Sequence, residues 1–114
     1  MTRLFVDCDG TLVLPSGDEP SYPVGNTKLV ETLIEKVNAD ESIELFIWSG
    51  GGKAYAAFWG HRLLPALPWK AINKDMQLPE YDDLCIDDAQ LTVACNVVTW
   101  EEYCAADSSQ SGKA

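Results

Sequence analysis

The sequence predicts an α/β domain built on a mostly parallel sheet of five strands. Short apolar segments alternate along the chain with segments of helical spacing, and the turns between them are rich in Gly and Pro. A length of 114 residues fits one hydrophobic core, which a hydrophobic content of 46% can fill. We expect the domain to span residues 1–106. Residues 107–114 are expected to form a disordered polar tail, because they offer no large apolar side chain to bury.

The first half of the domain begins with a short apolar strand at residues 3–7. Residues 12–25 contain three Pro and two Gly, so a loop or flap is predicted there. A helix follows, because Asn26 or Thr27 can cap its start and apolar residues recur at helical spacing as far as Val37.

The second half repeats this alternation. An apolar strand at residues 44–48 runs into Ser-Gly-Gly-Gly, and a helix over 53–63 ends before two prolines. Thr99 and Glu102 have the spacing of a capping box, which predicts a short final helix. The remaining predicted strands cover residues 69–73, 84–87 and 96–99.

Composition argues against several classes of protein. The net charge of −10 is unlike that of a nonspecific nucleic-acid binder, which neutralises phosphates with Lys and Arg. The four cysteines form no C-x-x-C pair and His61 is the single histidine, so no zinc site is expected. We interpret Cys8 and Cys85 as small core side chains. Because no apolar run is long enough for a bilayer or a signal peptide, we expect a cytoplasmic protein without a membrane partner.

Polar side chains follow three of the predicted strands. Asp7, Ser49 and Asp87 each stand at the carboxyl end of an apolar segment. In parallel sheets, ligands bind beyond the carboxyl ends of the strands. We therefore expect these three side chains to meet at one edge of the sheet and to form the functional site.

The segment Asp7-Cys8-Asp9-Gly10-Thr11-Leu12 carries the strongest chemical signal. Asp7 can attack phosphorus to give an aspartyl-phosphate, which divides hydrolysis into two easier steps. Asp9 can protonate the leaving oxygen and later take a proton from water. Gly10 lets the chain turn sharply, and Thr11 adds a hydroxyl close to the phosphate position. A tight Asp-Gly turn after a strand is the alternative, purely structural interpretation.

The acidic pair Asp87-Asp88 suggests a cation site. Two neighbouring acids at the end of a buried strand repel each other unless a cation or hydrogen-bond donors compensate. Mg²⁺ takes hard oxygen ligands and is the expected cofactor, with a solvated acidic turn as the alternative. A phosphate beside these carboxylates also needs a permanent positive charge, and Lys70 and Lys74 both lie upstream in the right region.

Ser49 and the three glycines after it stand at the start of the second predicted helix. Exposed N–H groups at a helix start bind anions, and the Ser49 hydroxyl can add a directed hydrogen bond. Gly50 is the glycine expected to contact a substrate. A capping serine followed by a flexible linker explains this segment equally well.

With these pieces in this order, the chain resembles the haloacid dehalogenase superfamily of phosphohydrolases. The resemblance covers most of the chain, from Arg3 to Trp100. Lys74 fits the family's lysine better than Lys70 by its spacing to Asp87, and Lys70 stays an alternative. The matching segments are Asp7-Cys8-Asp9-Gly10-Thr11-Leu12, Leu45-Phe46-Ile47-Trp48-Ser49-Gly50, Lys74-Asp75 and Leu84-Cys85-Ile86-Asp87-Asp88.

The resemblance implies a Rossmann-like three-layer sandwich with the first strand near the middle of its sheet. It implies no cap domain, because neither gap between the motifs has room for one. The roles it implies are Asp7 as nucleophile, Asp9 as general acid and base, and Ser49 and Lys74 as holders of the phosphoryl group. Mg²⁺ would be bound by Asp7, the main-chain carbonyl of Asp9 and Asp87, with Asp88 assisting.

These observations predict a Mg²⁺-dependent phosphomonoesterase acting on a small phosphorylated metabolite or nucleotide. A polynucleotide end or a phosphoprotein is the alternative substrate, because capless relatives accept bulky substrates or close their sites by oligomerising. Small stand-alone members of this kind are frequent in bacteria and bacteriophages. A receiver-like phospho-acceptor module without enzymatic activity is a second alternative. Most of the four tryptophans are expected to pack in the core or at the sheet edge. If any aromatic pair faces a substrate, Tyr55 with Trp59 on the second helix is the best candidate, whereas His61 is expected to pack or lie on the surface.

Overall fold

The structure is a computed structural model that describes residues 2–15, 24–74, 79, 83–88 and 96–112, with side chains as far as Ala106. At its centre is a five-stranded sheet in the order β5-β4-β1-β6-β7, and every neighbouring pair of strands is parallel. This confirms the predicted parallel α/β sheet with the first strand in the middle. The strands are β1 (Thr2–Asp7), β4 (Ile43–Ser49), β5 (Trp69–Asn73), β6 (Leu84–Ile86) and β7 (Asn96–Val98).

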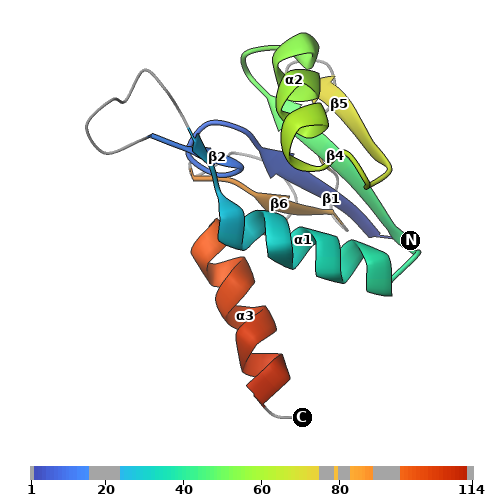
Figure 1. Cartoon of the computed structure of the whole chain (residues 1–114), viewed down its shortest axis with the longest axis vertical. Helices are drawn as coiled ribbons and strands as arrows, with labels where there is room; N and C mark the ends of the chain where they lie inside the picture. The colour runs from blue at the N-terminus through green and yellow to red at the C-terminus, as the bar shows by residue number, and fades with distance from the viewer. Residues whose placement is uncertain (1, 16–23, 75–78, 80–82, 89–95, 113–114) are drawn as a thin grey trace.

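The helices are α1 (Thr27–Ala39), α2 (Lys53–Leu63) and α3 (Trp100–Gly112) (Figure 1). Asn26 caps α1, because its Oδ1 accepts the N–H of Leu29 at 3.3 Å. The predicted capping box of α3 is also present. Glu102 N–H donates to Thr99 Oγ1 at 3.1 Å, and Thr99 N–H donates to Glu102 Oε1 at 3.0 Å.

Helix α3 is longer than expected. Residues 107–112 continue the helix to Gly112, where the sequence predicted a disordered tail. Two alanines precede this segment, and a helix that has been nucleated extends at little cost for each further residue. The polar composition of residues 107–112 therefore did not end the helix.

The predicted flap is closed at its base by two short strands. β2 (Val13–Leu14) and β3 (Val24–Gly25) pair antiparallel, while residues 16–23 lie outside the described part of the chain. The amide of Asn26 donates to the carbonyl of Thr11 at 2.9 Å and so ties this base to the start of α1. The loop after β1 is thereby fixed at both of its ends.

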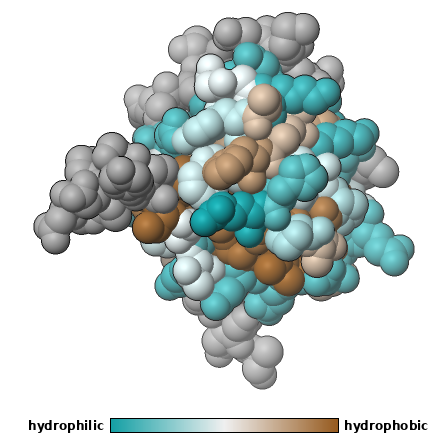
Figure 2. All heavy atoms as spheres, turned by 45° about the horizontal axis from the view of Figure 1, so that its top comes forward, coloured by the Kyte–Doolittle hydropathy of each residue, from teal (hydrophilic) through white to brown (hydrophobic). Residues whose placement is uncertain are grey.

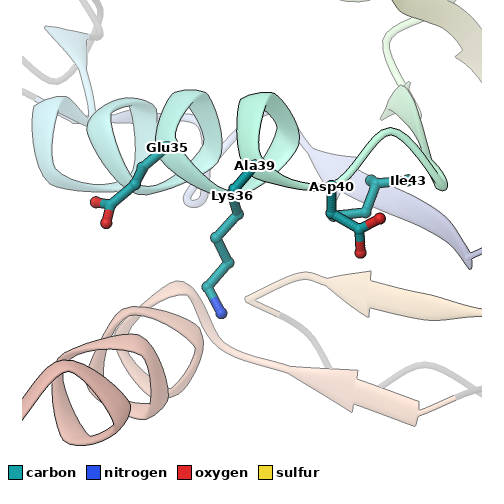
Figure 3. Close-up of a pocket in the computed structure, with 5 residues that line it drawn as sticks. All are labelled: Glu35, Lys36, Ala39, Asp40 and Ile43. Carbon is teal, nitrogen blue, oxygen red and sulfur yellow. The ribbon is translucent and has the colours of Figure 1, made fainter. Parts of the chain in front are cut away.

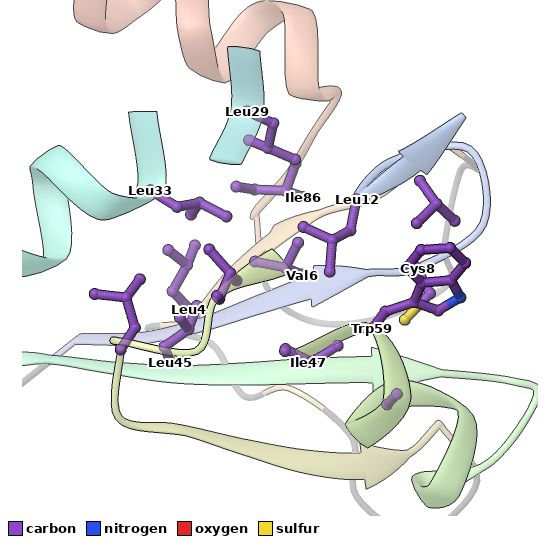
Figure 4. Packing of buried hydrophobic residues seen from close by; sticks show 14 of the residues in the cluster. Leu4, Val6, Cys8, Leu12, Leu29, Leu33, Leu45, Ile47, Trp59 and Ile86 are labelled. Atoms are coloured by element: carbon purple, nitrogen blue, oxygen red, sulfur yellow. The ribbon is translucent and has the colours of Figure 1, made fainter. Parts of the chain in front are cut away.

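Two hydrophobic clusters form the core, one on each face of the sheet. In the first, alternating residues such as Leu4 and Val6 pack against Leu29 and Leu33 of α1 (Figure 4). All three described helices contribute to this cluster. The second cluster consists of Phe5, Phe46, Trp48 and Cys85, all from strands. The described residues therefore show the sheet and one helical layer. The second helical layer of the expected sandwich is not among the described residues.

Burial agrees with the interpretation of the cysteines, since Cys8 and Cys85 have no exposed surface. Burial, followed by the nearby charge of Asp7, raises the pKa of Cys8 to about 12, so its thiol stays protonated at neutral pH. None of the helices within the described ranges has the length and apolar character needed to cross a bilayer.

Candidate functional site

The carboxyl edge of the sheet brings together side chains from four separate segments. β1 lies between β4 and β6, and the register pairs Asp7 with Trp48. Asp7, Ser49 and Asp87 therefore meet at one edge, as the sequence predicted. Lys74 joins them because it directly follows β5, whose last residue pairs with Ser49.

Lys74 bridges two carboxylates of this edge. Its Nζ lies 2.7 Å from Asp7 Oδ1 and 2.8 Å from Asp87 Oδ2. Burial opposes the charged form of Lys74, but the hydrogen bonds to both carboxylates outweigh it and raise the pKa of the lysine. Lys70 instead lies over the ring of Phe46, with its Nζ 6.0 Å from the ring centroid. Of the two candidate lysines, Lys74 is the one in the site.

Three carboxylates are placed to share a cation. One oxygen from each of Asp7, Asp87 and Asp88 lies within 4.8 Å of the other two. Asp7 and Asp87 are buried, whereas Asp88 is exposed and leaves one side open to solvent. Hard oxygen donors of this kind fit Mg²⁺, which takes a few carboxylates together with waters and phosphate oxygens. Lys74 pairs with two of the three carboxylates, so a cation here would share them with its ammonium group. The Asp9 carboxylate is not part of this group; only its main-chain carbonyl was expected there.

Asp7 is held in an environment that resists its ionisation. Burial, with a contribution from the charge of Asp87, raises the pKa of Asp7 to about 7, although Lys74 opposes this shift. Thr11, which is fully buried, directs its hydroxyl to Asp7 Oδ2 at 3.5 Å, the outer limit of a hydrogen bond. A further cation at this edge would favour the charged carboxylate.

Asp9 has a partner that the motif did not reveal. The hydroxyl of Tyr55, on α2, donates to Asp9 Oδ1 at 2.6 Å. Trp59 is only 8% exposed and lies in the first core cluster. This agrees with the core packing expected of most of the tryptophans, and not with the alternative in which Trp59 faces a substrate beside Tyr55. His61 is exposed and packs edge-on against Trp69, as a surface or packing residue would.

Ser49 and Gly50 lie at the expected edge, and the Ser49 oxygen is an acceptor within its own turn. Its Oγ accepts the N–H of Gly51 at 3.0 Å, and the residue is 2% exposed. The carbonyl of Ser49 accepts the N–H of Lys74 at 3.0 Å, which links the ends of β4 and β5. Gly50 is exposed in the turn before α2.

The backbone conformation at Gly10 requires glycine. Its φ is +81°, a region that L side chains rarely adopt, and a Cβ there would also force the exposed Asp88 side chain to move. Gly10→Ala is expected to lower the free energy of unfolding by about 2 kcal/mol, measured by urea denaturation. Gly50→Ala is the matched control, because a Cβ at Gly50 meets nothing within 4 Å. If the two substitutions lowered the free energy of unfolding equally, the requirement for glycine at position 10 would be contradicted.

The surface outside this edge offers no comparable constellation among the described residues. A shallow pocket lies where α1 ends and β4 begins, at the opposite edge of the sheet (Figure 3). Its lining residues are Glu35, Lys36, Ala39, Asp40 and Ile43. On the face shown in Figure 2, apolar residues form small groups separated by polar ones. Val24 and Phe58 are the large apolar side chains exposed within the described part, at 50% and 54%.

No protein-family model, curated protein or solved structure significantly matches the chain. The fold and the site alone therefore define its class. It is a parallel α/β domain with a cluster of aspartates and one lysine at the carboxyl edge of its sheet.

Proposed function

We propose that the protein is a Mg²⁺-dependent phosphomonoesterase that works through an aspartyl-phosphate on Asp7. One observation carries the proposal: Lys74 bridges Asp7 and Asp87 at the edge where Asp88 adds a third carboxylate. A buried nucleophile, a fixed positive charge and a set of hard oxygen ligands are the parts that phosphoryl transfer requires. The motif resemblance to haloacid dehalogenase phosphohydrolases supports the same assignment.

The first half-reaction forms a bond between an Asp7 carboxylate oxygen and phosphorus. The bond from phosphorus to the ester oxygen breaks, and that oxygen takes a proton from Asp9. Lys74 neutralises charge on the phosphoryl group and keeps Asp7 oriented. Mg²⁺, held by Asp7, Asp87 and Asp88, would supply further charge neutralisation when bound.

The second half-reaction regenerates Asp7. Asp9, now a carboxylate, takes a proton from the water that attacks phosphorus, and phosphate leaves as the bond to Asp7 breaks. The proposed substrate is a small phosphorylated metabolite or nucleotide in the cytoplasm. A polynucleotide end or a phosphoprotein is the alternative, and the net charge of −10 disfavours the polynucleotide.

The test is phosphate release from p-nitrophenyl phosphate by the purified full-length chain. We expect turnover with Mg²⁺, loss of turnover with EDTA, and recovery when Mg²⁺ is restored. A panel of phosphorylated metabolites, mononucleotides and end-phosphorylated oligonucleotides then identifies the substrate class. Absence of turnover throughout the panel would contradict the proposal. A stable phosphoprotein formed from acetyl phosphate without turnover would favour the receiver-like alternative instead.

Magnesium is also expected to stabilise the fold, because a ligand that binds the native state shifts unfolding by mass action. At a Mg²⁺ concentration 100 times its dissociation constant, the gain is about 2.7 kcal/mol. Thermal unfolding with increasing Mg²⁺ measures it. Asp87→Asn, which removes one of the three carboxylates, should reduce the gain. An unchanged melting temperature of the native chain across the titration would count against the metal site.

A further inference from the structure

One short hydrogen bond joins α2 to the loop after β1. The Tyr55 hydroxyl donates to Asp9 Oδ1 at 2.6 Å, although the two residues are 46 positions apart in the chain. We propose that Tyr55 is a positioning residue, whose hydroxyl orients Asp9 so that the other carboxyl oxygen delivers the proton to the leaving group. This inference rests on the proposed phosphatase function and assigns a role to a residue outside its motifs.

The chemistry of a carboxyl group explains the orientation. Protonated Asp9 carries one proton, and an oxygen that accepts a strong hydrogen bond is the poorer site for it. With Oδ1 engaged by Tyr55, Oδ2 is the oxygen left free to give a proton to the leaving group. After the proton has been delivered, the same hydrogen bond keeps the Asp9 carboxylate in one orientation, with Oδ2 facing the phosphoryl group. The Tyr55 hydroxyl thus orients Asp9 without transferring a proton itself.

Tyr55 is suited to remain the donor in this pair. Burial, followed by the hydrogen bond to Asp9, raises the pKa of Tyr55 above its usual range. The hydroxyl therefore keeps its proton at neutral pH.

The Tyr55 ring is held by the loop that carries Ser49. A Cβ at Gly51 would lie 3.2 Å from Tyr55 Cδ2 and 3.3 Å from Ser49 Oγ, so the backbone of Gly51 passes close to both side chains. The ring also packs against the first core cluster. Asp9, by contrast, is exposed, and an exposed aspartate samples several rotamers unless a partner restricts it. A residue on a packed helix thereby orients a residue on a loop.

The test compares Tyr55→Phe with the native chain on substrates that need a general acid to different degrees. Dinitrophenolate leaves without protonation, whereas an alkoxide does not. We expect kcat/KM for an alkyl phosphate to fall about 10-fold to 100-fold. This is only part of what a general acid contributes, because Asp9 itself is still present. For dinitrophenyl phosphate, kcat/KM should change less than about 2-fold, because Asp9 is not needed as acid in that reaction.

Two comparisons isolate the role. Tyr103→Phe removes a hydroxyl from α3, on a ring that Lys36 covers at 5.3 Å, and is expected to leave both substrates unaffected. In an Asp9→Asn background, Tyr55→Phe should cause no further loss on the alkyl phosphate, because the two residues act as a unit.

Equal losses on the two substrates, additive losses in the double variant, or no loss at all would each overturn the inference. A native chain without phosphatase activity would instead overturn the proposed function itself. The two failures are therefore distinguishable.

Discussion

Asp7→Asn is expected to abolish phosphate release and at the same time to stabilise the fold. An amide cannot attack phosphorus as a carboxylate does, so turnover should fall by about 10³-fold or more. Stability changes in the opposite direction because the native site resists ionisation of this residue. Burial raises the pKa of Asp7 from 3.8 to about 7, and Asn at this position carries no charge at any pH.

The sign of the stability change depends on pH. Between about pH 4 and pH 7 the folded chain binds more protons at Asp7 than the unfolded chain, so stability falls as pH rises through this window. Above pH 7, ionised Asp7 lowers the free energy of unfolding by its full amount, about 4 kcal/mol. Asp7→Asn should therefore raise the free energy of unfolding by up to about 4 kcal/mol at pH 8 without Mg²⁺, and change it little at pH 4.

Urea denaturation at the two pH values measures this effect, and Asp40→Asn is the control. Asp40 is exposed, and hydrogen bonds from Ser42 lower its pKa, so the same chemical change there should destabilise slightly if at all. If Asp7→Asn were no more stable than the native chain at pH 8, the claim that burial raises the pKa of Asp7 would be wrong. Such a gain of stability on loss of activity is typical of residues that serve function at the expense of the fold.

The sequence contains enough local information to predict the strands and the residues that stand at their carboxyl ends. Each strand of the sheet is an apolar segment bounded by turn residues, and all five lie within one residue of their predicted ends. Once the strands are parallel, residues at their carboxyl ends must share an edge. The meeting of Asp7, Ser49 and Asp87 thus followed from positions in the sequence, and so did the need for glycine at position 10.

Other features depend on contacts that the sequence pattern does not contain. The choice between Lys70 and Lys74 is set by the register of β5 on β4, which pairs Lys70 with Phe46 and brings Lys74 just beyond Ser49. The hydrogen bond from Tyr55 to Asp9 depends on how α2 packs over the sheet. Both are long-range consequences of packing, which motifs and periodicity do not specify.

Substitution of Lys74 is the other change for which we expect a large loss of stability and turnover. Lys70 provides the control, because it lies only four residues away in the sequence but outside the site. Lys74→Met keeps an apolar stem over Trp48, where Lys74 Nζ now lies 4.9 Å from the ring centroid, but removes the charge between Asp7 and Asp87. Leaving buried carboxylates without their partner should cost about 3 kcal/mol of stability at pH 8. Turnover should fall about 10²-fold to 10³-fold, because a preorganised positive charge is lost. Lys70→Met, which removes only an exposed cation over Phe46, should change stability by less than about 0.5 kcal/mol and leave turnover unchanged.

Magnesium separates the structural and catalytic roles of Lys74. Without the ammonium group, Asp7 and Asp87 repel each other more strongly, so Mg²⁺ should stabilise Lys74→Met by more than it stabilises the native chain. The difference in unfolding free energy between the two chains should therefore narrow as Mg²⁺ is added. The loss of turnover should persist, because under the proposed function the cation does not replace the hydrogen bonds that Lys74 would give to the phosphoryl group. Recovery of full turnover at high Mg²⁺ would show that Lys74 serves only to hold the carboxylates together. Equal losses in the Lys70 and Lys74 variants would place the phosphate site elsewhere.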